Sequence, residues 1–255
     1  MQDEKHVDGP TLDRRRVLQA FGAGTALVGL GTGTAAADDH CYPEELVSGD
    51  DVHPVFGFSA LEADVEPPVE PDHEIEAMIR PVEGREIPEF FYEPTGLSVE
   101  PGDTVRFTLA TPHHTVTAYH PAFGQVQRVP DGVPPFSSPV LGGGAYWLYT
   151  FETEGVYDFH CGPHESFGHA GRIVAGSATG PGAEPLPEPE DEGEGESGGE
   201  DGAEDESEGE GEELRPPVFA AGTVLGDPAL DPERIVDRGR VSWDEIADES
   251  KELPF

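Results

Sequence analysis

Short β-branched and aromatic runs, separated by turn residues, constrain the fold of this chain more than any other sequence feature. In one of them Val105, Phe107 and Leu109 alternate with polar residues, as in a strand with one buried face. Turn signals such as residues 100–103 (Glu-Pro-Gly-Asp) and the three glycines at 142–144 separate the runs. The pattern predicts an antiparallel sandwich or barrel of roughly 100 residues. The runs are Glu74–Arg80, Thr104–Ala110, Thr115–His120, Tyr146–Glu152, Val156–Cys161 and Arg172–Ala175.

Composition divides the chain around this domain. Residues 38–72 are acidic, contain proline and have no sustained periodicity, which indicates an N-terminal extension before the domain at 73–180. Residues 181–214 are a Pro/Gly/Glu tract with too little apolar surface to order itself, so we expect a disordered acidic linker. The 26 prolines and the lack of a long stripe of period 3.6 exclude a helical bundle.

Short helical turns are predicted in the C-terminal segment, 215–255. The Asp-Pro pair at 231–232 is typical of an N-cap followed by proline at the first helical position. Residues 242–245 (Ser-Trp-Asp-Glu) have the spacing of a capping box. Turns that dock on the domain through Trp243 and Ile246, and a loosely structured tail, are both consistent with this pattern.

The charge of the chain excludes whole classes of partner. Fourteen basic residues stand against 53 acidic ones, a formal net charge of −39, and only Lys5 and Lys251 are lysines. A nucleic-acid binder needs a basic face to neutralise phosphates, and an anionic membrane surface would repel this chain. We therefore expect no nucleic acid as a partner, and loose or no membrane association.

The acidity extends beyond the linker. Residues 184–213 hold 16 acidic groups and no basic one, and subtracting these 16 charges from −39 leaves −23 for the rest. Self-repulsion at this density requires strong screening by salt. The composition favours adaptation to very high salt, as in halophilic archaea. An acidic surface for a basic partner is the alternative, although it does not explain the scarcity of lysine.

The N-terminus has the pattern of an export signal over residues 1–37. Residues 13–19 (Asp-Arg-Arg-Arg-Val-Leu-Gln) resemble the twin-arginine consensus, and an apolar, glycine-rich run follows to Leu30. Small residues at 34–37 suit signal peptidase. This predicts export in the folded state, to the extracellular space or the outer face of the cell membrane. A short core helix with a basic start and a lipidated Cys41 are the alternatives.

Histidine and cysteine concentrate in the predicted domain. Six of the ten histidines fall within residues 113–169, and Cys161 lies among them. A thiolate, imidazoles three and eight residues later at His164 and His169, and an imidazole from a distant strand form a mixed soft and borderline donor set. Such a set suits copper or zinc and not magnesium or calcium.

These residues resemble the small blue copper proteins, or cupredoxins, which include plastocyanin, pseudoazurin and the halocyanins of halophilic archaea. In that family a first histidine follows a proline near the start of a strand, as in residues 112–116 (Pro-His-His-Thr-Val). A late loop reads Cys-x-x-His, as in residues 161–164 here, and then Gly-Met-x-Gly, where residues 168–171 read Gly-His-Ala-Gly. The resemblance covers about 100 residues. It implies a Greek-key β-sandwich, one mononuclear type 1 copper ion and one-electron transfer.

Carried over residue by residue, the resemblance implies four copper-site positions. Cys161 corresponds to the thiolate ligand, and His114 and His164 correspond to the two imidazole ligands. His169 occupies the axial position, where the family has methionine. Met78, the only methionine after the predicted signal, lies in the first strand run and is not expected to reach the metal.

The neighbours of these positions are assigned in the same way. Thr115 stands where the family has an asparagine whose side chain braces the cysteine loop. His113, His120 and His160 are expected to face solvent or make hydrogen bonds and not to bind the metal. His160 alternates with Cys161 along its strand, so it should point to the other face.

Other interpretations of the two cysteines and of the metal stay open. Two cysteines in an exported protein are typical of a disulfide, here Cys41–Cys161. Cys41 lies in the extension, whereas Cys161 is central to a complete ligand motif. A structural zinc site is a further alternative, because zinc and copper share these ligands.

The sequence therefore predicts an exported copper protein that carries single electrons between redox protein partners as a monomer, and not an enzyme. One alternative is a subunit of a copper enzyme of the nitrite-reductase or oxidase type, with His160 bridging to a second site. Another is a zinc-bound or metal-free β-sandwich that acts as a binding module.

Overall fold

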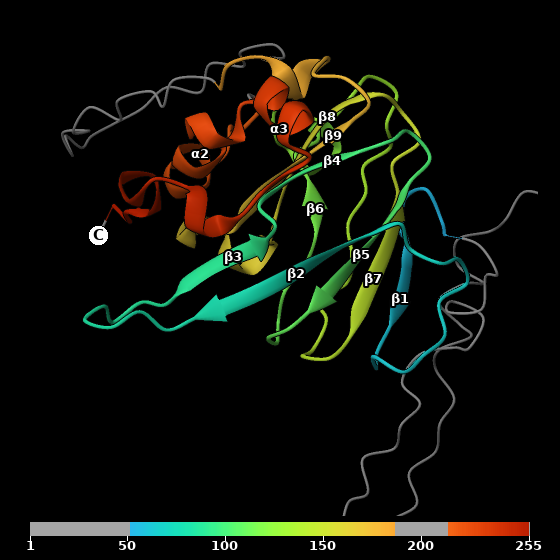
Figure 1. Ribbon diagram of the computed structural model, residues 1–255, viewed down its shortest axis with the longest axis horizontal. Helices are drawn as coiled ribbons and strands as arrows, with labels where there is room; N and C mark the ends of the chain where they lie inside the picture. The colour runs from blue at the N-terminus through green and yellow to red at the C-terminus, as the bar shows by residue number, and fades with distance from the viewer. Residues whose placement is uncertain (1–51, 187–213, 255) are drawn as a thin grey trace, which may run out of the picture. The chain divides into compact units, whose positions relative to one another are not determined.

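The computed structural model describes residues 52–186 and 214–254. Two five-stranded sheets form the framework of this part of the chain (Figure 1). The strand order is β1-β7-β5-β2-β3 in the first sheet and β10-β4-β9-β8-β6 in the second. The strands are β1 (Phe58–Ala60), β2 (His73–Arg80), β3 (Glu89–Glu93), β4 (Gly96–Val99), β5 (Thr104–Leu109), β6 (Thr117–Ala118), β7 (Tyr146–Thr150), β8 (Gly155–His160), β9 (Ala170–Ala175) and β10 (Arg240–Val241). The predicted all-β sandwich is confirmed.

The described helices are short. The α-helices are α2 (Phe219–Leu225) and α3 (Pro232–Arg238), and the 3-10 helices are η2 (Pro121–Phe123), η3 (Gly162–Phe167), η4 (Pro181–Ala183), η5 (Pro228–Leu230), η6 (Trp243–Glu245) and η7 (Asp248–Lys251). Within the described ranges no helix is both long and apolar enough to cross a membrane. The predicted signal at 1–37, and Cys41, lie outside the described residues.

The sheets are mixed, whereas the sequence pattern predicts a purely antiparallel sandwich. β2 pairs in parallel with β5, and β4 pairs in parallel with β9, whereas the other strand pairs are antiparallel. The reason is that the chain leaves the first sheet after β3, enters the second as β4 and returns as β5. Strands that are adjacent in a sheet are therefore often distant in the sequence.

The core lies between the two sheets and is rich in aromatic rings. In β5, Val105, Phe107 and Leu109 are buried, as their alternation predicts. Phe107 packs edge-on against Phe159 of β8 at a ring distance of 5.5 Å, which joins the two sheets. Trp147 of β7 is fully buried. β8, the strand that directly precedes Cys161, is thus anchored in the core.

The ordered sandwich extends beyond the segment from 73 to 180. β1 lies in the segment expected to be an extension, and it pairs with the edge strand β7. At the other end, residues 181–186 were expected to belong to the linker. The buried Arg128 instead donates hydrogen bonds to the main-chain carbonyls of Pro181, Gly182 and Glu184.

The C-terminal segment packs on the outer face of the sandwich (Figure 1). Asp231 caps α3, and residues 242–245 form a capping box, as their sequences indicate. β10 pairs with the edge strand β4. Trp243 and Ile246 are buried in an apolar cluster with Phe91 of β3, whose ring stacks on Trp243 at 5.2 Å. Of the two interpretations of this segment, docking on the domain is the one observed.

Candidate metal centre

The four predicted site residues, His114, Cys161, His164 and His169, converge at one end of the sandwich. One donor atom from each lies within 4.8 Å of the others. Cys161 Sγ is 3.3 Å from His164 Nδ1 and 3.7 Å from His114 Nδ1, and the two Nδ1 atoms are 3.2 Å apart. These three donors form a compact triangle, with His169 as a fourth, buried neighbour.

Three of the four residues come from one β-turn-β unit. Cys161 follows β8 and is the N-cap of η3, and His164 lies within that 3-10 helix. His169 directly precedes β9, and its main-chain carbonyl accepts a hydrogen bond from the Cys161 N–H at 2.9 Å. Because β8 and β9 pair over six residues, the two ends of the loop are held together. The Cys-x-x-His spacing therefore folds into one half of the site.

His114 reaches the site from the loop after β5. His113, directly before it, has a φ of 70°, which is uncommon for a residue with a side chain. Its N–H donates to the carbonyl of Leu141 at 2.8 Å. Thr111 Oγ1 lies 2.8 Å from Nε2 of His114, a hydrogen bond that leaves Nδ1 to face Cys161. Such outer hydrogen bonds orient the ring of a metal-binding histidine.

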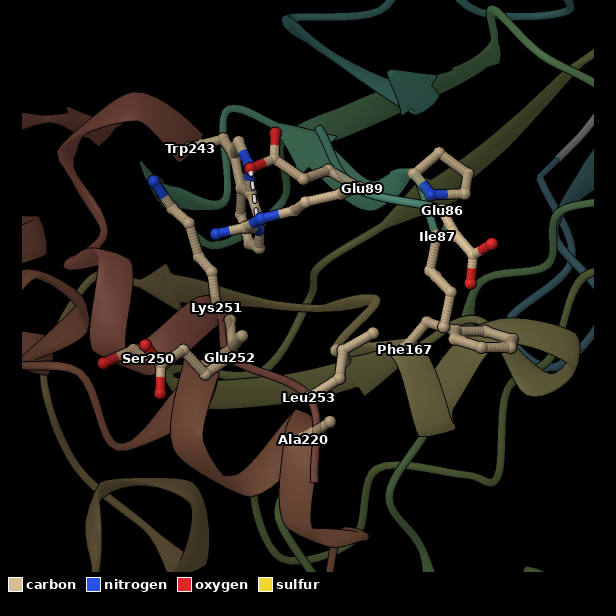
Figure 2. A pocket seen from close by; sticks show the side chains of 14 residues that line it. Glu86, Ile87, Glu89, Phe167, Ala220, Trp243, Ser250, Lys251, Glu252 and Leu253 are labelled. Atoms are coloured by element: carbon tan, nitrogen blue, oxygen red, sulfur yellow. Dashed lines mark ion pairs between the residues drawn. The ribbon is translucent and has the colours of Figure 1, made fainter. Parts of the chain in front are cut away.

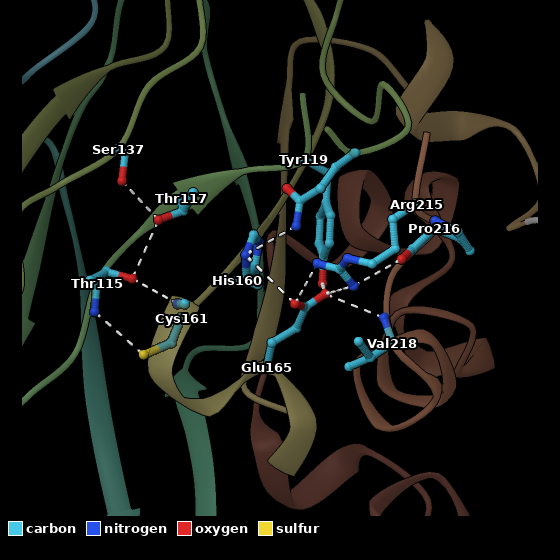
Figure 3. A network of polar contacts seen from close by, with 12 residues as sticks. Thr115, Thr117, Tyr119, Ser137, His160, Cys161, Glu165, Arg215, Pro216 and Val218 are labelled. Carbon is cyan, nitrogen blue, oxygen red and sulfur yellow. Dashed lines mark hydrogen bonds and ion pairs between the residues drawn. The ribbon is translucent and has the colours of Figure 1, made fainter. Parts of the chain in front are cut away.

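Thr115 braces the cysteine loop, although it stands where the resembling family has asparagine. Its hydroxyl accepts a hydrogen bond from the Gly162 N–H at 2.8 Å, and its N–H points at Cys161 Sγ at 3.4 Å (Figure 3). Tyr92 Oη donates to the Thr115 carbonyl at 2.6 Å and fixes the main chain there. The brace is therefore made by a shorter side chain.

His169 is fully buried and lacks ordinary hydrogen bonds. Neither ring nitrogen has a hydrogen-bond partner of normal geometry. Its ring centroid lies 4.1 Å from that of Tyr92 and 4.8 Å from that of His114. Buried polar atoms are nearly always paired. A bound metal ion would supply the missing partner for a ring nitrogen of His169.

Burial keeps the imidazoles neutral. Desolvation, followed by the nearby His164 and His113, lowers the pKa of His114 to about 4. Desolvation also lowers the pKa of His164, and it holds that of His169 well below its usual value, with His114 and His164 adding to the shift. Neutral imidazoles are the form that binds metal.

The thiol of Cys161 behaves in the opposite sense. Burial raises its pKa, against the hydrogen bonds from Thr115 and His164. A bound cation offsets the cost of burying the thiolate, because its positive charge stabilises the negative sulfur. A coordinating thiol therefore loses its proton. Cys161 is a free cysteine within the described residues.

The donor set and its spacing fit a single soft or borderline ion. A metal about 2.0–2.3 Å from imidazole nitrogen and thiolate sulfur requires donors separated as the three Nδ1 and Sγ atoms are here. Nitrogen and sulfur donors favour copper or zinc. His114, Cys161 and His164 would hold the ion, and His169 would offer a fourth donor.

The other histidines in the described part of the chain lie outside this cluster. His113 is exposed, and the ring of His120 accepts a hydrogen bond from the Ala122 N–H at the start of η2. His160 points away from the Cys161 side chain, as its alternation predicts, but it is buried and stacks on Tyr119 at 4.4 Å. Met78 packs against the apolar cluster beneath the C-terminal segment and not at the site.

The sequence does not indicate that Phe90 and Phe167 pack against each other beside His164. Phe90 of β3 stacks on the His164 ring at 4.4 Å and on Phe167 at 4.9 Å. A cavity of about 450 Å³ opens beside Phe167, between the turn before β3 and the C-terminal residues (Figure 2). Phe90 belongs to a run of three consecutive aromatic residues, 90–92. That run was the available signal for a strand at this position.

Comparison with known proteins agrees with this geometry. Residues 82–176 match the family described as copper binding proteins of the plastocyanin/azurin family. The matched range contains all four residues of the cluster. The segment that carries the site therefore matches the copper-binding plastocyanin/azurin family, and its fold is a β-sandwich.

Individual relatives agree on the family. The chain is 34% identical over 92 residues to plastocyanin from Prochlorothrix hollandica, covering 32% of this chain and 61% of that protein. It is 29% identical over 105 residues to a putative pseudoazurin from Rhizobium leguminosarum bv. viciae, covering 41% and 60%. The chain thus spans about three fifths of these relatives. Among solved structures, pseudoazurin from Methylobacterium extorquens AM1 is 26% identical, covers 41% of this chain and 76% of its own, and has a TM-score of 0.32.

Proposed function

We propose that this chain is an exported, salt-adapted copper protein that carries single electrons between redox protein partners. One observation supports the proposal above all: Cys161 Sγ and the Nδ1 atoms of His114 and His164 form a triangle with sides of 3.2–3.7 Å, beside the buried His169. The relatives, plastocyanin and a pseudoazurin, are electron-transfer cupredoxins and not enzymes.

The protein's contribution to such a function is a fixed cage. A bound copper ion supplies the one-electron couple. The hydrogen bonds from Thr111 and Thr115 orient His114 and Cys161 before the ion arrives, and the β8–β9 pairing holds the loop. A preorganised set of donors needs little rearrangement when the charge at its centre changes. A low cost of rearrangement is what fast electron transfer requires.

His164 is the proposed point of electron entry and exit. It is the partly exposed member of the cluster, whereas the other three are buried. Its ring packs on Phe90, and the exposed Pro163 lies beside it. A partner that docks over this loop would reach the centre through one side chain. Redox proteins are the proposed partners, and the chain is proposed to act as a monomer.

The copper-enzyme alternative needs His160 to reach a second metal site. His160 is 4% exposed and is enclosed by side chains of its own chain: it stacks on Tyr119, and Gln125 Nε2 lies 3.4 Å from its Nε2. In this arrangement the ring is not presented to another subunit. The carrier function therefore has the stronger structural support.

Export and salt adaptation rest on the sequence. The twin-arginine pattern at 13–19 supports export in a folded state, to the extracellular space or the outer face of the membrane, with loose or no attachment to it. The net charge of −39 and the presence of only two lysines support adaptation to high salt.

Visible absorption of the copper-loaded protein tests the proposed site. Only a thiolate bound to Cu(II) gives an intense charge-transfer band, and Cys161 is the cysteine at the cluster. We expect Cys161→Ser to abolish the band and Cys41→Ser, the matched control, to keep it. A colourless copper-loaded wild type would favour the zinc or metal-free alternative, and loss of the band in Cys41→Ser would contradict the assignment to Cys161.

A further inference from the structure

A buried carboxylate lies inside the ligand loop. Glu165 follows His164 in η3, and only 7% of the residue is exposed. Tyr119 Oη donates to its Oε1 at 3.1 Å, and Arg215 donates to Oε1 and Oε2 at 3.2 and 2.8 Å. The Val218 N–H donates to Oε1 at 3.3 Å, so both carboxylate oxygens are bound (Figure 3).

Two of these partners belong to the C-terminal segment. Arg215 and Val218 are separated from the loop by some 50 residues that include the acidic tract. The helix that follows them, α2, also packs on the loop: a Cβ added at Gly168 would lie 3.3 Å from Val224 Cγ2. The C-terminal segment therefore contacts the loop at two points, beside His164 and directly before His169.

Glu165 does not belong to the four-donor cluster, but its backbone connects the two histidines. The Gly168 N–H donates to the Glu165 carbonyl at 3.0 Å, and the His169 N–H donates to the His164 carbonyl at 3.3 Å. A carboxylate fixed by several donors thus fixes the main chain on both sides of it. If the carboxylate is released, His164 and His169 lose a shared support.

We propose that Glu165 is a positioning residue for the metal centre, and that Arg215 and the C-terminal segment hold it in place. The inference rests on the proposed copper site, to which it adds a role for residues 214–254. Two charge-assisted hydrogen bonds from one guanidinium fix both the position and the orientation of a carboxylate. Arg215 is also suited to a test by substitution, because its side chain is 44% exposed and can be replaced without opening the core.

The test compares Arg215→Ala with a matched control, Arg240→Ala. Arg240 also comes from the C-terminal segment and pairs with a glutamate of the sandwich, Glu93, at 3.3 Å, but it does not contact the loop. In the metal-free protein we expect amide hydrogen exchange at residues 164–169 to accelerate about tenfold or more in Arg215→Ala only. Loss of an outer-shell partner lowers metal affinity by about 10–100-fold, so Cu(I) affinity should fall within this range.

Spectroscopy separates positioning from general stability. In copper-loaded Arg215→Ala the thiolate band and the EPR hyperfine splitting should shift, whereas Arg240→Ala should match the wild type. Arg215→Lys should shift the spectra less than Arg215→Ala does, because lysine keeps the positive charge but donates from a single point. Glu165→Gln should act like Arg215→Ala, because its amide group places a donor against the guanidinium.

The two failures are distinguishable. A wild type without a thiolate–copper band contradicts the proposed function, while exchange in the metal-free protein still tests whether Arg215 holds the loop. If Arg215→Ala and Arg240→Ala give the same exchange rates, Cu(I) affinity and spectra as the wild type, Glu165 is not a positioning residue and the inference is wrong.

Discussion

Asp158 of β8 offers the sharpest test of how this fold is held together. It is fully buried and is shared by two buried arginines. Arg172 Nε and Nη2 donate to its two oxygens at 2.6 and 3.0 Å, and Arg128 Nε donates at 3.0 Å. The arginines in turn bind the carbonyls of Leu230 and of residues 181–184. One carboxylate therefore compensates the charges that connect both later segments to the sandwich.

Asp158→Asn should destabilise the fold strongly. The substitution keeps the side-chain volume but removes the negative charge and turns an acceptor into a donor against a guanidinium. Removal of one partner of a buried ion pair costs about 3–5 kcal/mol, because the remaining charge is left uncompensated. For a chain of this size that corresponds to a fall in Tm of about 6–20 °C.

Urea unfolding at constant, molar KCl measures this loss. The control is Asp244→Asn, which breaks the ion pair with Arg80 at 2.9 Å, where the aspartate side chain is 72% exposed. A surface pair of this kind contributes at most about 1 kcal/mol. If Asp158→Asn loses no more free energy of unfolding than Asp244→Asn, the charged cluster does not hold the segments in place.

Two further predictions concern salt and the axial position. Lowering the salt from 1 M to 0.1 M lengthens the Debye length from about 3 to about 10 Å, so unfolding should need less urea; replacing the acidic residues of 188–213 with glutamine should leave most of this dependence, because −23 of the −39 lies outside residues 184–213. Equal stability at both salt concentrations would rule out the salt adaptation. His169→Met should raise the reduction potential and give a bluer copper site, since a thioether is a weaker axial donor than imidazole. An unchanged spectrum and potential would show that His169 does not bind the ion.

The sequence predicts the strands whose two faces differ. β5 alternates because one face meets the core and the other meets polar surroundings. β3 does not, because Phe90, Phe91 and Tyr92 are all buried. Tyr92 faces the core, whereas Phe91 stacks on Trp243 of the C-terminal segment. A strand covered on both faces loses its period of two, and the covering Trp243 lies 152 residues after Phe91 along the chain.

The same distinction applies to the site. The Cys-x-x-His motif and the later His169 are local in sequence, so their spacing predicts their convergence. The pairing of Glu165 with Arg215 has no local signal, because 50 residues separate the partners. Likewise, β1 and β10 have three and two residues, too few to show a pattern, and they are specified by the edges they complete.

A reductive titration of the copper-loaded protein, followed by visible absorption, tests the central claim most directly. We expect one copper ion per chain and a thiolate band that disappears after the addition of one electron per chain. The band should return unchanged on reoxidation, because the cage of His114, Cys161 and His164 is assembled by the fold itself. A band that needs more than one electron, or that does not return, would contradict a function as a one-electron carrier.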